Sequence, residues 1–347
     1  MTPLERLPIP LLEWYGEHAR KLPWRDDPTA YHVWVSEIML QQTRVAAVLD
    51  YYRRFMEAAP TVGDLARLPD EQLMKLWQGL GYYSRARNLK KAAEQIVEQF
   101  GGEFPHDYAD IRALPGVGDY TAGAISSIAF GWAVPAVDGN VLRVVTRLTA
   151  DKSDITLPAT KRNVAAQLSE IIPTAQPGQF NQAMMELGAT VCIPNGAPLC
   201  EKCPAAEFCL ARQKGLTDKL PVKAPKKERK IEERAVFLVF YEDKVALRKR
   251  PEKGLLAGLW EFPNELAPAD DALNRWGIEG ETVPGDTGRH IFSHIEWRMC
   301  AVMVRADSDH LPEGWVWAGR QELERRYAVP NAFRAFEPAV RERLGYF

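Results

Sequence analysis

The 347-residue sequence has no long uninterrupted apolar run, little net charge and no basic leader at its start. Its most apolar stretch, residues 121–137, is interrupted by serine, glycine and proline, so we predict no membrane-spanning segment. The opening residues include Glu5 and Arg6 and lack a signal-peptide pattern, which predicts a cytoplasmic protein in a reducing compartment. A net charge of −2 excludes a polycation, so a nucleic-acid site would have to rely on local patches and backbone amides.

The first part of the chain, residues 1–217, is predicted to form an all-α domain. Apolar residues recur at spacings of three and four, as between Val35 and Phe55, and proline and glycine separate one periodic segment from the next. The hydrophobic content of 46% is ample for packed cores, and the length favours two domains.

The character of the chain changes after this helical region. Residues 218–232 are rich in lysine and arginine, which predicts an exposed basic linker. Residues 233–347 are predicted to form an α+β domain that contains a hairpin at 235–250, a strand at 298–304 and a final helix from Phe333 to Leu344.

Four of the five cysteines lie close together near the end of the helical region. Their spacing, C-x7-C-x2-C-x5-C, within a loop rich in proline and glycine, is typical of one metal centre held by Cys192, Cys200, Cys203 and Cys209. Zinc and a [4Fe–4S] cluster both accept four thiolates, so the spacing leaves the metal open. Cys300 lies in the expected strand, which favours a buried and inert thiol.

The segment LPGVGDYTAGAI, residues 114–125, predicts a hairpin between two helices. Gly116 and Gly118 permit a tight turn around Val117, and the helix that follows presents free backbone N–H groups that can hold a phosphate. Such donors would let a nearly neutral chain bind DNA. An ordinary glycine-containing helix connection is the alternative.

The hairpin, the motif AVDGNV at residues 136–141 and the cysteine loop together resemble the helix-hairpin-helix DNA glycosylases of the endonuclease III superfamily. Residues 22–45 and 180–192 are similar to the MutY-type adenine DNA glycosylases, and the resemblance covers essentially the whole chain. It implies a monomeric, nucleoid-associated enzyme with a Nudix-like (MutT-like) second domain. This enzyme would remove adenine opposite 8-oxoguanine or guanine in double-stranded DNA.

The same resemblance implies a [4Fe–4S] cluster at the four cysteines. The cluster would fix a loop that presents Lys202 and Arg212 to the DNA backbone. The first cysteine interval has seven residues, where the family usually has six.

Hydrolysis of an adenine N-glycosidic bond needs a proton for the departing base and a carboxylate near the sugar cation. The resemblance assigns the acid to Glu37 and the carboxylate to Asp138, with Asn140 orienting that carboxylate or the attacking water. Tyr120 stands where the endonuclease III enzymes carry a Schiff-base lysine, which implies a monofunctional glycosylase. From the residues alone, a solvated Glu37, a turn-forming Asp138 and a helix-capping Asn140 remain alternatives, as does a packed aromatic at Tyr120.

Excision also requires that the base leaves the duplex stack. The resemblance implies an adenine pocket lined by Trp24, Arg25 and Gln182, and wedge and lesion contacts from Gln42, Thr43, Leu80 and Tyr82. It also implies a monovalent cation held at the hairpin by the carbonyls of Leu114 and Val117. Taken singly, Gln42 and Thr43 could be ordinary polar surface residues, and Tyr82 and Trp24 could simply pack in the core.

Residues 245–265 are similar to the opening of a MutT-type Nudix domain. The stretch that follows lacks glutamates at helical spacing to hold Mg²⁺, so we predict a domain that binds without hydrolysing. The resemblance places Phe292, Ser293 and His294 in the loop that recognises 8-oxoguanine. A structural strand residue is the alternative for His294.

Three other functions compete with this hypothesis. They are a lyase that acts on oxidised pyrimidines, a nucleotide pyrophosphohydrolase built on the second domain, and a zinc module that only binds DNA. Tyr120 opposes the first, the missing glutamates oppose the second, and iron at the four cysteines would exclude the third.

Overall fold

The computed structural model describes residues 1–225 and 228–345 and divides the chain into two compact units. Unit 1 comprises Met1–Arg67 and Arg87–Pro225, and unit 2 comprises Leu68–Ala86 and Lys226–Phe347. The expected division at residues 217 and 233 did not anticipate that the segment Leu68–Ala86 groups with the C-terminal unit. Among the described residues, no helix is long and apolar enough to cross a membrane.

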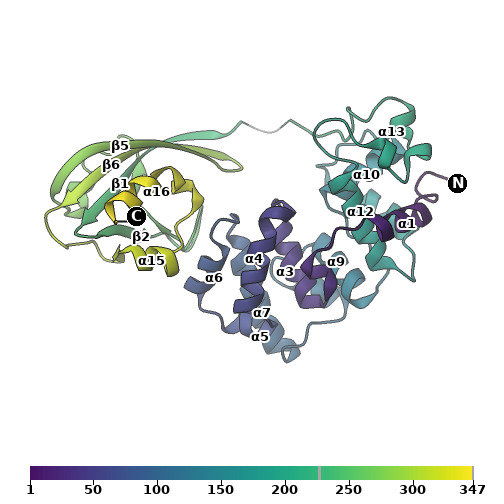
Figure 1. Ribbon diagram of the computed structural model, residues 1–347, viewed down its shortest axis with the longest axis horizontal. Helices are drawn as coiled ribbons and strands as arrows, with labels where there is room; N and C mark the ends of the chain where they lie inside the picture. Colours follow the sequence, from purple (N-terminus) through teal and green to yellow (C-terminus); the bar gives the residue numbers. More distant parts are fainter. Residues whose placement is uncertain (226–227, 346–347) are drawn as a thin grey trace. The chain divides into compact units, whose positions relative to one another are not determined.

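Unit 1 is helical, as predicted (Figure 1). In chain order its elements are α1 (Pro8–His18), α2 (Pro23–Asp26), α3 (Ala30–Leu40), α4 (Val45–Ala58), α5 (Val62–Arg67), α7 (Ser84–Phe100, which enters the unit at Arg87), α8 (Tyr108–Ala113), α9 (Asp119–Phe130), α10 (Gly139–Thr149), α11 (Pro158–Ser169), α12 (Pro177–Thr190), the 3-10 turns η1 (Cys200–Lys202) and η2 (Ala206–Phe208), and α13 (Leu210–Gln213).

Local sequence signals begin and end the helices that carry the site. Thr29 caps α3 by accepting a hydrogen bond from the His32 backbone N–H, and Asp138 caps α10 by accepting one from the Val141 backbone N–H. Helix α9 ends at Gly131, whose φ of +71° is the left-handed conformation that glycine adopts without strain. Almost every residue of α3 is buried, as expected of a helix in the middle of a core.

The helices of unit 1 that carry the candidate site residues pack closely against one another. Helix α9 packs against α3 and α12, and α12 also packs against α10 and α1. A Cβ atom at Gly188 on α12 would lie 2.6 Å from the Cβ atom of Asn140, so only glycine permits this contact with the start of α10. Fully buried side chains such as Phe180 each stabilise the folded unit by about 1.5–3 kcal/mol. Their packing keeps the helices in contact.

Unit 2 is built around a mixed sheet with strand order β3-β2-β1-β6-β5. Strand β1 pairs in parallel with β6 and antiparallel with β2, while β5 and β6 form an antiparallel pair. The elements are α6 (Asp70–Trp77), β1 (Lys230–Tyr241), β2 (Lys244–Lys249), β3 (Trp260–Glu261), β4 (Asn264–Leu266), α14 (Ala272–Trp276), β5 (Gly280–Ile291), β6 (Ile295–Ala306), β7 (Trp315–Ala318), α15 (Arg320–Arg325), η3 (Asn331–Phe336) and α16 (Glu337–Arg343).

Both faces of this sheet are covered. One hydrophobic cluster joins β1, β2 and β6 to η3 and α16, and a second joins the opposite face to α14. The predicted hairpin is confirmed as β1 and β2, and the predicted strand at 298–304 is confirmed within β6. The expected final helix is instead divided into the 3-10 helix η3 and the short α16.

Two further expectations were wrong in part. The predicted linker, residues 218–232, is not uniformly exposed, because Leu220 is buried and the Arg147 guanidinium donates to its carbonyl, and because β1 already begins at Lys230. Cys300 is exposed rather than buried. Successive side chains of a strand point to opposite faces, and β6 buries the neighbours Met299 and Ala301 instead.

Candidate active site and cysteine-lined cavity

Glu37 and Tyr120 meet in the interior of unit 1. Glu37 lies on α3 and is only 6% exposed, and the Tyr120 hydroxyl at the start of α9 donates a hydrogen bond to its carboxylate. The same hydroxyl lies 3.2 Å from the Met185 sulfur on α12. The expected acid, Glu37, and the residue at the lysine position of the endonuclease III enzymes, Tyr120, are therefore in direct contact, which the sequence did not predict.

Burial controls the protonation of Glu37. Removal from water raises the pKa of this carboxyl to about 7, and the nearby negative charge of Asp138 acts in the same direction. The hydrogen bond from Tyr120 and the positive charge of Arg25 act against this rise in pKa. A carboxyl that keeps its proton up to about neutral pH is suited to general acid catalysis.

Asp138 is oriented by its role as a helix cap. One carboxylate oxygen accepts the Val141 N–H at 2.8 Å, and the other accepts the Asn140 side-chain N–H at 2.7 Å. Burial raises the pKa of Asp138, and these two hydrogen bonds offset only part of that rise. Asn140 thus orients the carboxylate, which was one of the roles expected of it.

Arg143 links this site to the cysteine loop. Its guanidinium donates to the Asn140 side-chain oxygen at 2.8 Å, to the Gly188 carbonyl at 2.7 Å and to the Cys192 carbonyl at 2.7 Å. A continuous set of hydrogen bonds therefore runs from Asp138 through Asn140 and Arg143 to the first cysteine. Arg143 was not predicted as a site residue, although its position three residues after Asn140 in the sequence places the two side chains on one face of a helix.

Arg25 and Gln182, expected in the adenine pocket, belong to a second polar group. The Arg25 guanidinium donates to the Glu186 carboxylate at 2.8 Å, and Gln182 accepts a hydrogen bond from the Tyr15 hydroxyl at 3.2 Å. Neither Glu186 nor Tyr15 was found from the sequence. Trp24 is buried and packs edge-on against Tyr52.

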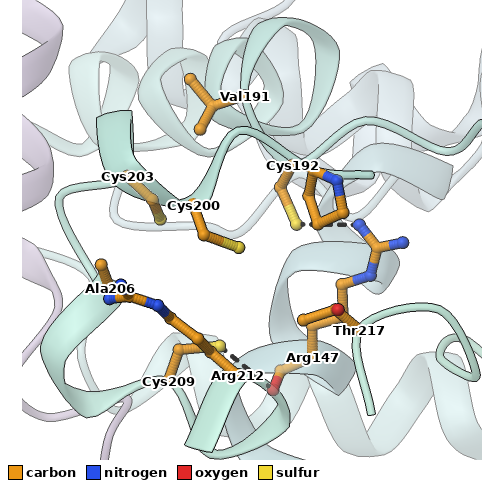
Figure 2. Close-up of a pocket in the computed structure, with 10 residues that line it drawn as sticks. Arg147, Val191, Cys192, Cys200, Cys203, Ala206, Cys209, Arg212 and Thr217 are labelled. Carbon is orange, nitrogen blue, oxygen red and sulfur yellow. Dashed lines mark hydrogen bonds between the residues drawn. The ribbon is translucent and has the colours of Figure 1, made fainter. Parts of the chain in front are cut away.

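The four clustered cysteines line one cavity, together with Arg147 and Arg212 (Figure 2). Figure 2 shows the thiol groups of Cys192, Cys200, Cys203 and Cys209 arranged around a shared space. Arg147 donates to the Cys192 sulfur at 3.3 Å, and its carbonyl accepts from the Cys209 thiol at 3.6 Å. Among the described residues, no group of three or more candidate ligands is close enough to hold a single metal ion. Four thiols that line one cavity are the type of ligand that a zinc ion and an iron–sulfur cluster both accept.

The predicted hairpin is confirmed between α8 and α9. Gly116 has a φ of +78°, and Gly118 lies at the N-cap of α9. The Val117 carbonyl, an expected cation ligand, accepts a hydrogen bond from the Arg112 guanidinium at 3.0 Å, and the Leu114 carbonyl accepts the Val117 N–H at 3.1 Å. The Arg112 guanidinium thus engages one of the two carbonyls, and a bound cation there stays a prediction.

Unit 2 brings Tyr82 to the loop between β5 and β6. The Tyr82 hydroxyl lies 3.0 Å from the Ser293 hydroxyl, and 48% of Tyr82 is exposed. Ser293 and His294 lie outside both strands, so the alternative of a strand residue at position 294 does not hold. Phe292 packs against Trp297 and His290.

The other expected wedge residues differ in exposure. Gln42 is exposed with a φ of +58°, just beyond the end of α3, whereas Leu80 is buried. Thr43 is half-buried, and its hydroxyl donates to the Gln41 carbonyl. Their contacts with DNA stay predictions.

Comparison with known proteins agrees with this arrangement. Residues 35–174 match the family described as HhH-GPD superfamily base excision DNA repair protein, and residues 235–336 match the NUDIX domain family. The chain is 38% identical to the adenine DNA glycosylase of Homo sapiens over 94% of its own length and 73% of the relative.

Two solved structures resemble the helical part. A thermostable thymine-DNA glycosylase aligns with a TM-score of 0.56 and 28% identity over 61% of this chain and 97% of that one. Endonuclease III in a trapped covalent intermediate with DNA aligns with a TM-score of 0.52 and 27% identity over 62% of this chain and 100% of that one.

The helix-hairpin-helix fold, with the buried Glu37 in contact with Tyr120 beside the hairpin, is that of the DNA glycosylases of base-excision repair. Within that class, the chain belongs to the adenine DNA glycosylase family.

Proposed function

We propose that this protein hydrolyses the N-glycosidic bond of adenine paired with 8-oxoguanine or guanine in double-stranded DNA. The observation that carries this proposal is the buried Glu37, which keeps its proton up to about pH 7 and whose pKa is also raised by the nearby, half-buried carboxyl of Asp138. Two carboxyl groups with different environments are what acid-assisted cleavage of a glycosidic bond requires.

The reaction follows from these positions. Glu37 donates its proton to a ring nitrogen of the extruded adenine, and the bond between C1′ and N9 breaks with its electron pair moving to the base. The sugar becomes an oxocarbenium ion, which the Asp138 carboxylate stabilises. Water then adds to C1′ and releases a proton, which leaves an abasic site and free adenine.

Tyr120 sets the reaction class. It has no amine to form a Schiff base with the abasic sugar, so borohydride is expected to trap no covalent adduct while adenine is released. The measurement is denaturing gel analysis of the reaction, with a lysine-bearing endonuclease III enzyme as the positive control. A trapped adduct on the wild-type protein would show that it is a lyase.

The four cysteines fit a [4Fe–4S] cluster, which would supply a structural centre when bound. Cys192, Cys200, Cys203 and Cys209 would hold it, and the guanidinium groups of Arg147 and Arg212 offset the negative charge of the thiolates. Lys202 and Arg212 are exposed on this loop, where they can meet DNA phosphates.

Iron is therefore expected in the purified protein, at about four atoms per chain, with brown colour. Cys203→Ser should lose iron and lower the melting temperature, whereas Cys300→Ser should keep both, because Cys300 is exposed on β6. Metal analysis and visible absorption measure this. A colourless protein that contains stoichiometric zinc would contradict the cluster.

We propose that unit 2 recognises 8-oxoguanine and does not hydrolyse nucleotides. The helix α14 consists of Ala272–Trp276 and carries no carboxylate with which to hold Mg²⁺. Ser293 and Tyr82 lie together on an exposed loop and turn, where a damaged base could be contacted from two sides.

The proposal is tested with duplexes that hold adenine opposite 8-oxoguanine, guanine or thymine. Adenine release is expected from the first two and not from the third. Equal release from all three would remove the proposed specificity, and pyrophosphate release from oxidised dGTP would instead assign a hydrolase to unit 2.

A further inference from the structure

Glu186 stands at the centre of a buried ion cluster in unit 1. It lies on α12, one helical turn after Gln182, and is only 1% exposed. Its carboxylate accepts two hydrogen bonds from the Arg20 guanidinium, at 2.5 and 2.9 Å, and one from Arg25 at 2.8 Å. Burial acts to raise the pKa of Glu186, but the two guanidinium groups outweigh it and lower that pKa, so the group is ionised.

The cluster closes into a ring around Arg25. The second nitrogen of the Arg25 guanidinium donates to the Arg20 carbonyl at 3.0 Å, and its carbon lies 5.5 Å from the centre of the Tyr15 ring. The Tyr15 hydroxyl in turn donates to the Gln182 side-chain oxygen at 3.2 Å. Arg25 is thus held by a carboxylate, a carbonyl and an aromatic face, and Gln182 has its amide oxygen engaged.

We propose that Glu186 is a positioning residue, which fixes Arg25 and offsets its charge so that Glu37 can hold the proton needed for adenine departure. The inference rests on the proposed function, since it concerns the acid of the same reaction. Glu186 is assigned no contact with the base.

The electrostatic argument follows from the charged neighbours of each group. Glu37 is influenced by Tyr120 on α9, Asp138 before α10 and Arg25 on α2. Glu186 is influenced by Arg20 and Arg25, with Tyr15 beside them. Arg25 is common to the two sets. A carboxylate paired with Arg25 reduces the positive potential that reaches Glu37.

Removal of the Glu186 charge should lower the pKa of Glu37. In Glu186→Gln, Arg20 and Arg25 both lose their counter-charge, so Arg25 stabilises the ionised form of Glu37 more strongly. Glu37 then loses its proton at lower pH. The falling limb of the pH–rate profile therefore shifts to lower pH, by roughly one pH unit. Removal of the Arg25 charge in Arg25→Met should move the limb in the opposite direction. A residue that only supports the fold would lower the rate at every pH and leave the limb in place.

The experiment measures single-turnover adenine release from a duplex with adenine opposite 8-oxoguanine across the pH range, using the full chain. Glu186→Gln is compared with Glu186→Asp, which keeps the charge, and with Glu13→Gln, which removes a carboxylate from an exposed position on α1. We expect the falling limb to shift to lower pH in Glu186→Gln and to higher pH in Arg25→Met. It should not shift in Glu186→Asp or Glu13→Gln.

An unmoved falling limb in folded Glu186→Gln would overturn the inference, whatever Arg25→Met shows, while the wild-type activity would still uphold the proposed function. A wild-type protein that releases no adenine would overturn the proposed function itself. If Glu186→Gln does not fold, the direction of the Arg25→Met shift decides, and a downward or absent shift refutes the role.

Discussion

Glu37→Gln is expected to lower the single-turnover rate of adenine release by about 10²–10⁴-fold while duplex binding is retained. Glutamine has nearly the same shape and can still accept the hydrogen bond from Tyr120, but it carries no proton to give to the departing base. Because Glu37 is buried with a pKa of about 7, the substitution removes a neutral acid rather than a charge from the folded protein at lower pH. Its effect on stability should therefore be small.

The exposed Glu13→Gln is the matched control, since it makes the same chemical change away from the site. Rates come from quenched single-turnover reactions and affinities from titration of a non-cleavable duplex. Full activity of Glu37→Gln would refute the assignment of the acid. Loss of both binding and thermal stability would show that the residue is needed for folding instead.

Asp138→Asn is expected to lower the same rate by about 10²–10³-fold. The substitution keeps an oxygen that can accept the Val141 N–H, so the cap of α10 survives, and asparagine is itself a good N-cap. The negative charge that faces the sugar cation is lost, and two amide N–H groups now face each other at Asn140. We therefore expect a large loss of rate with a change in the free energy of unfolding of about 1 kcal/mol or less.

Asp107→Asn provides the control for this substitution. Asp107 caps α8 by accepting the Ala109 N–H at 2.7 Å, so the same change of residue is made at a cap outside the site. Thermal denaturation and single-turnover kinetics are measured for both variants. Equal activity of Asp138→Asn and Asp107→Asn would leave Asp138 with only its capping role.

Signals local in sequence predicted much of the fold. The hairpin between α8 and α9, the β1–β2 hairpin and the cysteine loop each depend on glycine, proline or cysteine at short spacing, and the structure contains all three. The roles of Glu37, Asp138 and Tyr120 came from the family resemblance. Each of these residue types is otherwise common in solvated helices, turns and cores.

Contacts between distant segments were not predictable in this way. Arg20 and Glu186 lie 166 residues apart, and nothing in either local sequence indicates that they pair. Cys300 illustrates a second limit, since both faces of strand β6 carry apolar residues and the sequence does not show which alternation is buried. The grouping of Leu68–Ala86 with unit 2 depends on tertiary contacts, which a helical pattern cannot reveal.

The most direct test of the account is the pH dependence of adenine release by the wild-type protein from a duplex with adenine opposite 8-oxoguanine. Glu37 must be protonated and Asp138 ionised, so the single-turnover rate should rise at acidic pH as Asp138 loses its proton. The rate should then fall as the pH passes through about 7, the pKa of Glu37. The falling limb should be absent in Glu37→Gln. A wild-type rate that stays constant or increases above about pH 7 would contradict the acid-assisted mechanism.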